Sequence, residues 1–409
     1  MTNSNRLFYG SCFALITTAF SFSISAGTLK QLGIDLGYSA ENLGYISSLW
    51  FFGFPISMIM GGLVYNSIGP KRIMQTAFFT HILGLALTLI AIFFISEWSF
   101  ITLLISNLLL GIGCGCTEAA CNPMIANAYE GNIRNKMLNR FHMWFPGGIV
   151  VGALLSEGMA SIGLPWESQF WIILIPAIIY FYLFRGQIFP KAKLEHNALD
   201  ENSKAMTKPL FLFVFVCMAL TAITEFGPQK WTGLIMENSG GAKPMIILAL
   251  VTGLMAIARF FGGPVTKVLG QTGVLFFGAV FSTIGIYLFS SQTGGMTYLA
   301  AITFAMGVAF FWPTMIGFVA ENIPKSGALG LSVIGGVGMF STAIFQPIIG
   351  GWIDNSTFEQ TAKGLTGTML ELVAGQQTLT NMISFPLILI VLFTILYFWQ
   401  RNAKSTEVV

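Results

Sequence analysis

Charged residues are scarce in this sequence, and its long apolar stretches contain very few of them. Asp, Glu, Lys and Arg make up 9% of the 409 residues, whereas hydrophobic residues make up 55%. Soluble domains have about 25% charged residues. Because the deficit extends over the whole chain, it excludes a soluble domain with one anchor and indicates an all-α polytopic membrane protein.

Motifs for catalysis and metal binding are missing as well. The chain has five cysteines and three histidines, and none of them has metal-ligand spacing. We find no nucleophile–base pair or phosphate loop, and no continuous basic stripe. We therefore expect no enzyme activity, no cofactor, no metal and no nucleic-acid partner.

Apolar runs of about 20 residues, the length of a membrane-spanning helix, recur along the whole chain. They cover residues 7–29, 42–66, 73–95, 99–128, 138–162, 166–187, 208–236, 243–268, 273–291, 295–320, 327–353 and 379–400. The runs are too long and too uniformly apolar for barrel strands. The first run also exceeds the core of a signal peptide, about 7–15 residues, so we predict twelve transmembrane helices.

A polar stretch at residues 188–207 divides the chain into a six-helix half at 1–187 and a second at 208–409. The halves resemble each other in sequence. Gly62, Asn66 and Gly69 follow the second run, and Gly263, Lys267 and Gly270 follow the eighth at the same spacing. Two parallel, pseudo-symmetric six-helix halves predict an alternating-access transporter with its site near the membrane midplane.

Basic residues predict the orientation. If the N-terminus is cytoplasmic, most Lys and Arg fall in cytoplasmic segments, and only Lys30, Lys243 and Lys363 fall in outside loops. Such a bias indicates a multi-pass protein of the plasma (inner) membrane with both termini inside.

Several motifs resemble a known family. "GGLVYNSIGPKR" (61–72) is similar to the loop signature of the major facilitator superfamily. "GCTEAACNP" (115–123) resembles the helix-4 signature of the fucose/galactose/glucose permease family of sugar:cation symporters within it. "LNRFHMWFPGG" (138–148), "ARFFGG" (258–263) and "IGG" (334–336) are similar to further motifs of that family.

The resemblance implies the major facilitator fold and cation-coupled transport of a small polar solute, most simply a monosaccharide. Two departures matter. Asn66 stands where the superfamily has an acidic residue, and residues 7–29 contain no acid where proton-coupled members have one. The coupling ion, H⁺ or Na⁺, therefore stays open.

Four ionisable residues fall inside the predicted helices: Glu118, His142, Glu225 and Arg259. A charge at the bilayer centre costs at least about 2.5–3.5 kcal/mol, so such residues are expected to face a polar interior and to pair with one another. We expect all four to take part in cation coupling, with Glu118 or Glu225 as the counter-ion of Arg259. A purely structural role, in which an acid holds two helices together, is the alternative.

Substrate contacts are expected from polar and aromatic residues on the cavity-lining helices. The candidates are Glu118, Asn122, Glu225, Gln229, Trp231, Trp312 and Gln346. Gly227–Pro228 is predicted to break its helix and free backbone carbonyls. The tryptophans could equally belong to interfacial belts or to the packed core.

Two other functions stay open at the sequence level. A drug/proton antiporter of the same fold would favour a more apolar cavity than these Asn, Gln and Glu residues offer. A non-transporting membrane receptor would be expected to carry an added cytoplasmic domain, for which the linker leaves no room. We expect a monomer in the lipid bilayer whose partner is a small-molecule substrate.

Overall fold

The computed structural model describes residues 3–129, 137–138, 140–190, 199–236 and 243–406. Within these ranges the chain forms helices and short connections without strands. Two compact units are present. One comprises Met1–His196 with Ala343–Asp354, and the other comprises Asn197–Thr342 with Asn355–Val409.

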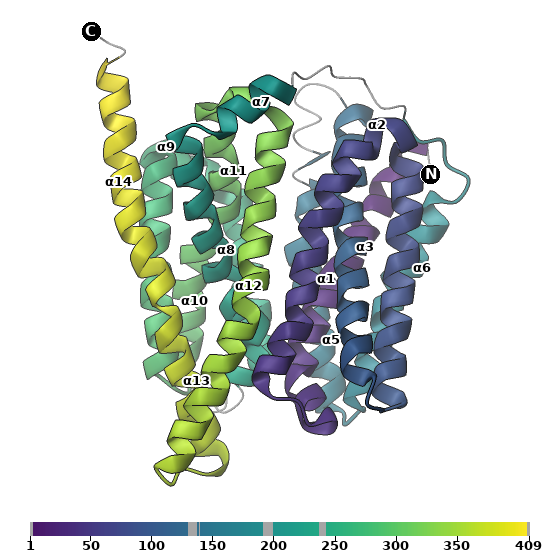
Figure 1. The fold of residues 1–409 in the computed structure, drawn as a ribbon, viewed down its shortest axis with the longest axis vertical. Helices are drawn as coiled ribbons and strands as arrows, with labels where there is room; N and C mark the ends of the chain where they lie inside the picture. The colour runs from purple at the N-terminus through teal and green to yellow at the C-terminus, as the bar shows by residue number, and fades with distance from the viewer. Residues whose placement is uncertain (1–2, 130–136, 139, 191–198, 237–242, 407–409) are drawn as a thin grey trace. The chain divides into compact units, whose positions relative to one another are not determined.

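The described part of the N-terminal unit contains five helices and a 3₁₀ segment before the linker (Figure 1). These elements are α1 (Asn3–Leu36), α2 (Ala40–Phe93), α3 (Ser99–Ala128), α5 (Trp144–Ser161), η1 (Trp166–Ile173) and α6 (Leu174–Phe184). The start of α1 lies beside the end of α6, because Arg6 donates a hydrogen bond to the carbonyl of Tyr182 and Asn3 donates to that of Ile188. The chain therefore enters and leaves this unit at the same end.

The C-terminal unit repeats this plan with additional short elements. It contains α7 (Leu199–Met206), α8 (Pro209–Ile235), α9 (Pro244–Ser291), α10 (Met296–Val308), α11 (Phe311–Asn322), η2 (Pro324–Ser326), α13 (Gly367–Met382) and α14 (Ser384–Thr406). Helix α12 (Gly327–Ala362) contributes to both units, since its residues 343–354 cluster with the N-terminal one.

Two glycines divide the longest helices at equivalent points. Gly69 interrupts α2 with φ 77° and ψ 160°, and Gly270 interrupts α9 with φ 67° and ψ 171°. Positive φ of this kind favours glycine because an L side chain would be strained there. The repeat that the sequence predicted around these glycines is therefore present in the backbone.

The predicted all-α membrane fold is confirmed. Eleven stretches of the described helices are long and apolar enough to cross a membrane. Helix α2 counts once among them, although the break at Gly69 separates it into two arms, each close to one predicted segment. The described part of the chain thus contains the twelve predicted spans.

Helices α2 and α3 pack closely because glycines face backbone across their interface. A Cβ on Gly111 would meet the carbonyl of Trp50, and one on Gly115 would meet the carbonyl of Phe54 and the hydroxyl of Ser57. Small residues at such contacts let transmembrane helices approach. This packing fixes the helix that carries Glu118.

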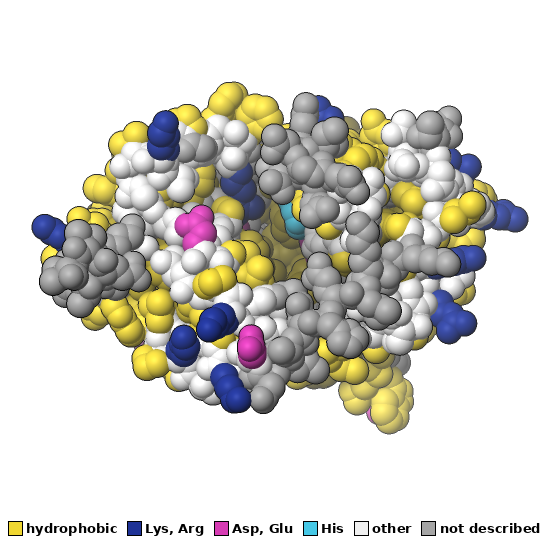
Figure 2. All heavy atoms as spheres, turned by 90° about the horizontal axis from the view of Figure 1, so that it is seen from above, with side chains coloured by type: hydrophobic (Ala, Val, Ile, Leu, Met, Phe, Trp, Pro, Cys, Tyr) yellow, Lys and Arg dark blue, Asp and Glu magenta, His cyan; other side chains and the backbone are white. Residues whose placement is uncertain are grey.

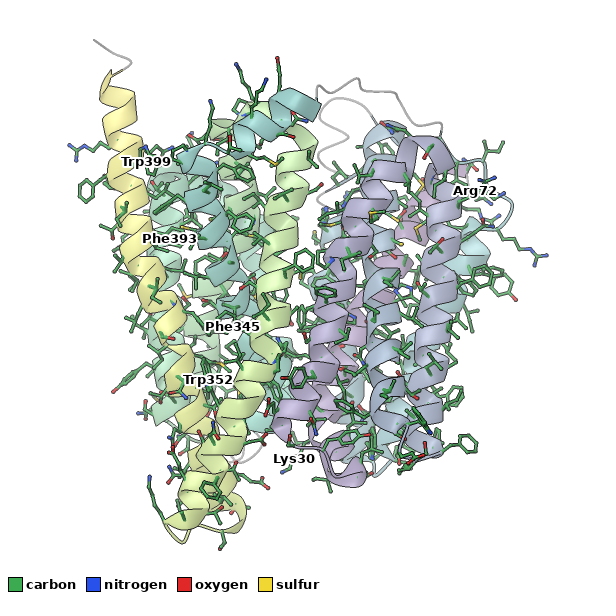
Figure 3. All side chains as sticks on the ribbon, viewed as in Figure 1. Lys30, Arg72, Phe345, Trp352, Phe393 and Trp399 are labelled. Carbon is green, nitrogen blue, oxygen red and sulfur yellow. The ribbon has the colours of Figure 1, made fainter. Side chains whose placement is uncertain are left out.

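Three expectations need correction or restriction. Lys30, expected in an outside loop, lies within α1 (Figure 3). The predicted break at Gly227–Pro228 is wrong, since α8 runs through both residues; a proline removes a single helical N–H, and the flanking turns hold the helix. In the predicted linker, residues 191–198 lie outside the described part of the chain, and Leu199–Met206 form α7.

Figure 2 shows Lys and Arg side chains, drawn dark blue, at scattered points among apolar ones. On α2, Arg72 follows the Gly69 break and points outward (Figure 3).

Candidate functional site

A buried ion pair lies inside the C-terminal unit. A guanidinium nitrogen of Arg259 on α9 lies 3.2 Å from Oε1 of Glu225 on α8. The Glu225 side chain is 5% exposed and that of Arg259 is 26% exposed. Of the two counter-ions considered for Arg259, the structure therefore pairs it with Glu225. The other carboxylate oxygen, Oε2 of Glu225, is buried and has no hydrogen-bond partner among the described residues.

The same guanidinium also contacts backbone. Nε of Arg259 donates a 2.7 Å hydrogen bond to the carbonyl oxygen of Ala309, which directly follows α10. In a continuous helix this carbonyl would accept from the N–H of residue 313. Residue 313 is a proline and has no N–H. Arg259 thus satisfies a carbonyl that Pro313 leaves open, at the point where α10 ends and α11 begins.

Gln229 lies one helical turn beyond Glu225 and faces the same neighbour. Its Nε2 donates to the sulfur of Met255 at 3.5 Å, and Met255 lies one turn before Arg259 on α9. Pairs at this spacing line one face of each helix. Gln229 also lines a small pocket among α8, α9 and α10, together with Thr232, Ile247 and Phe304.

The two tryptophan candidates have different environments. Trp312, in the first turn of α11, is half-buried and packs edge-on against Phe226, with ring centroids 6.2 Å apart. Phe226 directly follows Glu225, so Trp312 lies close to the ion pair. Trp231 is fully buried in α8 at 0% exposure, which is typical of a core residue.

In the N-terminal unit, Glu118 and Asn122 form the second polar pair. Both are half-buried on α3, and Nδ2 of Asn122 donates to Oε2 of Glu118 at 2.5 Å. They occupy one helix face, as their spacing of four predicted. The Oδ1 atom of Asn122 is buried and has no hydrogen-bond partner among the described residues.

The last two candidates differ in their exposure. His142 is exposed, two residues before α5 begins. Gln346 is fully buried in the part of α12 that clusters with the N-terminal unit, and a Cβ on Gly44 would come within 2.5 Å of its backbone carbonyl oxygen.

Sequence reasoning missed a chain of buried polar contacts in the N-terminal unit. Nδ1 of His81 lies 3.1 Å from the hydroxyl of Tyr180, and Nε2 lies 3.5 Å from the sulfur of Cys114. Ser21 lies 3.9 Å from that sulfur and accepts a hydrogen bond from the Trp50 indole. The place of His81 inside an apolar run was the signal that this side chain needs partners.

Comparisons with known proteins agree with this architecture. A family model described as Major Facilitator Superfamily matches residues 11–345. The cis,cis-muconate transport protein of Acinetobacter baylyi is 23% identical over 363 residues, covering 82% of this chain and 84% of that protein. The hexuronate transporter of Bacillus subtilis is 22% identical, with the same two coverages.

Among solved structures, a mutant form of the nucleoside transporter NupG superimposes with a TM-score of 0.77 at 14% identity. The match covers 96% of this chain and 99% of that one, and it shows a shared fold. Together with paired glycine breaks at Gly69 and Gly270 and apolar helices throughout, these matches establish a multi-pass transporter of small solutes and exclude an enzyme family. The chain belongs to the Major Facilitator Superfamily.

Proposed function

We propose that this chain is a cation-coupled transporter of a monosaccharide-type solute that works by alternating access. The observation that carries the proposal is the buried Glu225–Arg259 pair, because an ionised pair inside a transmembrane bundle is costly to retain without a use. The narrower membership that the sequence motifs indicate, in the fucose/galactose/glucose permease family, is part of the same proposal.

Each half of the chain supplies one acid for coupling. Glu118 has an amide neighbour, whereas Glu225 has a guanidinium neighbour. A carboxylate that gains or loses a cation changes the free energy of the side chains around it. We assign both acids to cation coupling with Arg259 as the fixed charge, and we keep His142 as a proposed accessory group near the helix end.

A polyhydroxylated solute suits the available polar groups. Carboxylate and amide oxygens accept hydrogen bonds from hydroxyl groups, and Asn122 has a carbonyl oxygen to offer. An aromatic face such as that of Trp312 suits the flat side of a sugar ring. The relative from Bacillus subtilis is a hexuronate transporter, which adds sugar acids to the candidates.

We further propose that the protein works as a monomer in the inner membrane with both termini cytoplasmic. Arg72 lies three residues after the Gly69 break and Lys267 three residues before the Gly270 break, so each half has a basic residue close to its break. Basic residues concentrate on the cytoplasmic side of membrane proteins.

Uptake into proteoliposomes tests the proposal. Purified protein is given a panel of radiolabelled neutral hexoses, pentoses, inositol and hexuronates, under a proton gradient or a sodium gradient imposed separately. We expect one class of polyhydroxylated solute to accumulate above its external concentration under one gradient. Accumulation of no panel member under either gradient would refute cation-coupled sugar transport. Empty liposomes are the control.

A further inference from the structure

We propose that Arg259 is a positioning residue that links the charge of Glu225 to the position of helix α11, by occupying the Ala309 carbonyl that Pro313 leaves open. The inference deepens the proposed function and rests on it for its purpose, since the linked charge is that of a proposed coupling acid. The contacts themselves lie wholly within the C-terminal unit.

The first step is the helix break. α10 ends at Val308 and α11 begins at Phe311, and the backbone N–H of Thr314 bonds to the carbonyl of Phe310 at 3.0 Å. The helical ladder therefore resumes one residue after Pro313. Ala309 is 0% exposed, so leaving its buried carbonyl unpaired would cost about 1–3 kcal/mol. A side chain from another helix supplies the missing donor.

The second step is the geometry of that donor. A guanidinium has several N–H groups in a rigid plane, so it can hold two acceptors at once. Here Nε holds the Ala309 carbonyl at 2.7 Å, and a terminal nitrogen holds Oε1 of Glu225 at 3.2 Å. One planar group thus bridges α8 and the α10–α11 break from its place on α9.

The third step is the free oxygen of Glu225. Oε2 is buried without a hydrogen-bond partner among the described residues, so it is the carboxylate oxygen that can take a proton without breaking a hydrogen bond. Protonation would remove the negative charge of Glu225, which holds the guanidinium of Arg259 against α8. The bridge would then lose one of its two ends, and α11 would be released from α8 at Trp312, which packs on Phe226.

Arg259 is the charged partner that the structure gives to Glu225. On α8 itself, Lys230 is buried and has contacts of its own. Of the other charged side chains described on the elements around α8, Asp354 of α12 is half-buried and accepts hydrogen bonds from the backbone N–H groups of Ala40 and Glu41. The rest are exposed: Glu201, Lys204, Lys267, Glu321, Glu359, Glu371 and Arg401. A proton also suits this position better than a metal cation, because a second full positive charge beside the guanidinium would be repelled in a medium of low dielectric constant.

The test follows Trp312 directly, without substrate or gradient. The nine tryptophans are labelled as 5-fluorotryptophan, and the ¹⁹F resonance of Trp312 is assigned by its loss in Trp312→Phe. We expect this resonance to shift with pH in a single titration. In Glu225→Gln it should stay near its low-pH position. The resonance of Trp399 on α14, assigned in the same way, is the internal control (Figure 3).

Two matched variants separate the bridge from a direct effect of charge. Arg259→Lys keeps the positive charge but lacks the rigid, planar set of N–H groups that spans both acceptors, so Trp312 should no longer titrate. Pro313→Ala supplies an N–H to the Ala309 carbonyl and should reduce the amplitude at least twofold while Arg259 is retained. If Arg259→Lys does not fold, Pro313→Ala decides the question by itself.

The inference is overturned if Trp312 does not titrate in the unmodified chain, or if it titrates with full amplitude in both variants. Because no solute is present, this outcome is independent of whether any sugar accumulates in proteoliposomes. A chain that transports without a titrating Trp312 would keep the proposed function and lose this inference.

Discussion

At the residue scale, the Glu225–Arg259 pair is the feature that most needs explanation. Taking two charges out of water is expensive, and their attraction offsets this cost only when the geometry is good and the remaining polar atoms are satisfied. Arg259 meets that condition through the Ala309 carbonyl, whereas Glu225 leaves Oε2 without a partner among the described residues. A pair that is incompletely satisfied on its acidic side is suited to a change of protonation during transport.

Removing one member of this pair should destabilise the protein more than removing both. We expect Arg259→Gln to lower the free energy of unfolding by about 3–5 kcal/mol, because it leaves a buried carboxylate uncompensated. Glu225→Gln combined with Arg259→Gln should recover part of that loss. Thermal unfolding of the purified variants in one detergent measures this. Losses that simply add in the double variant would contradict the coupling.

The His81 contacts allow a second residue-scale test with a close control. Tyr180→Phe removes the hydroxyl beside His81 and leaves a buried ring nitrogen unpaired, which should cost about 1–3 kcal/mol. Tyr182 lies two residues later on α6 and is 58% exposed, so Tyr182→Phe should have almost no effect. Equal melting temperatures for the two variants would show that the His81–Tyr180 contact contributes nothing to stability.

At the scale of helices, the sequence predicted the number, type and order of the spans well, because long apolar runs have few alternatives to helix in a membrane. It predicted break points unevenly. Gly69 and Gly270 were singled out because their spacing repeats after the second and the eighth run, and the structure has positive φ at both. The break at Gly227–Pro228 was predicted wrongly, and the one before Pro313 was not predicted. In either helix, a proline leaves the carbonyl four residues before it without its helical donor. The tertiary partner of that carbonyl decides which helix breaks.

The candidate site was predictable to a similar degree. Spacing of four residues gave the Glu118–Asn122 contact, because it follows from helix geometry alone. Spacing could not choose between Glu118 and Glu225 as the partner of Arg259, since that choice depends on how helices far apart in sequence pack. The burial of Trp231 and the exposure of His142 likewise depend on the rotation of each helix against its neighbours.

Close packing of α2 on α3 leads to an element-scale prediction. Gly115→Ala places a methyl group against the carbonyl of Phe54 and the hydroxyl of Ser57, so the helices must separate. We expect a loss of about 1–3 kcal/mol, as for other overpacked contacts. Gly147 has open space where its Cβ would be, so Gly147→Ala is the matched control and should be neutral. The comparison uses thermal unfolding and the yield of monodisperse protein after gel filtration. Equal behaviour of the two variants would refute the packing argument.

At the scale of the whole molecule, the chain combines two related halves that carry different polar pairs. The glycine breaks are equivalent, whereas one half has a carboxylate beside an amide and the other has a carboxylate beside a guanidinium. In the proposed cycle both acids respond to the cation, and the neighbouring groups bind the solute. The two halves therefore have separable contributions that substitution can measure.

Glu118→Gln separates coupling from transport. The amide keeps the size of the side chain and its ability to accept a hydrogen bond, but it cannot carry the negative charge that binds a cation. We expect this variant to insert, to fold and to exchange labelled solute across the membrane at equilibrium. If Glu118→Gln loses exchange because it does not fold, gel filtration will show the misfolding. Asn122→Asp then serves as the second variant at the same site.

Gradient-driven accumulation by Glu118→Gln is the most direct measurement of the central claim. Proteoliposomes with either the unmodified chain or Glu118→Gln receive the solute identified in the panel, under the gradient that drives it. The account predicts accumulation above the external concentration for the unmodified chain, and equilibration without accumulation for Glu118→Gln. Equal accumulation by both proteins would contradict the assignment of Glu118 to cation coupling.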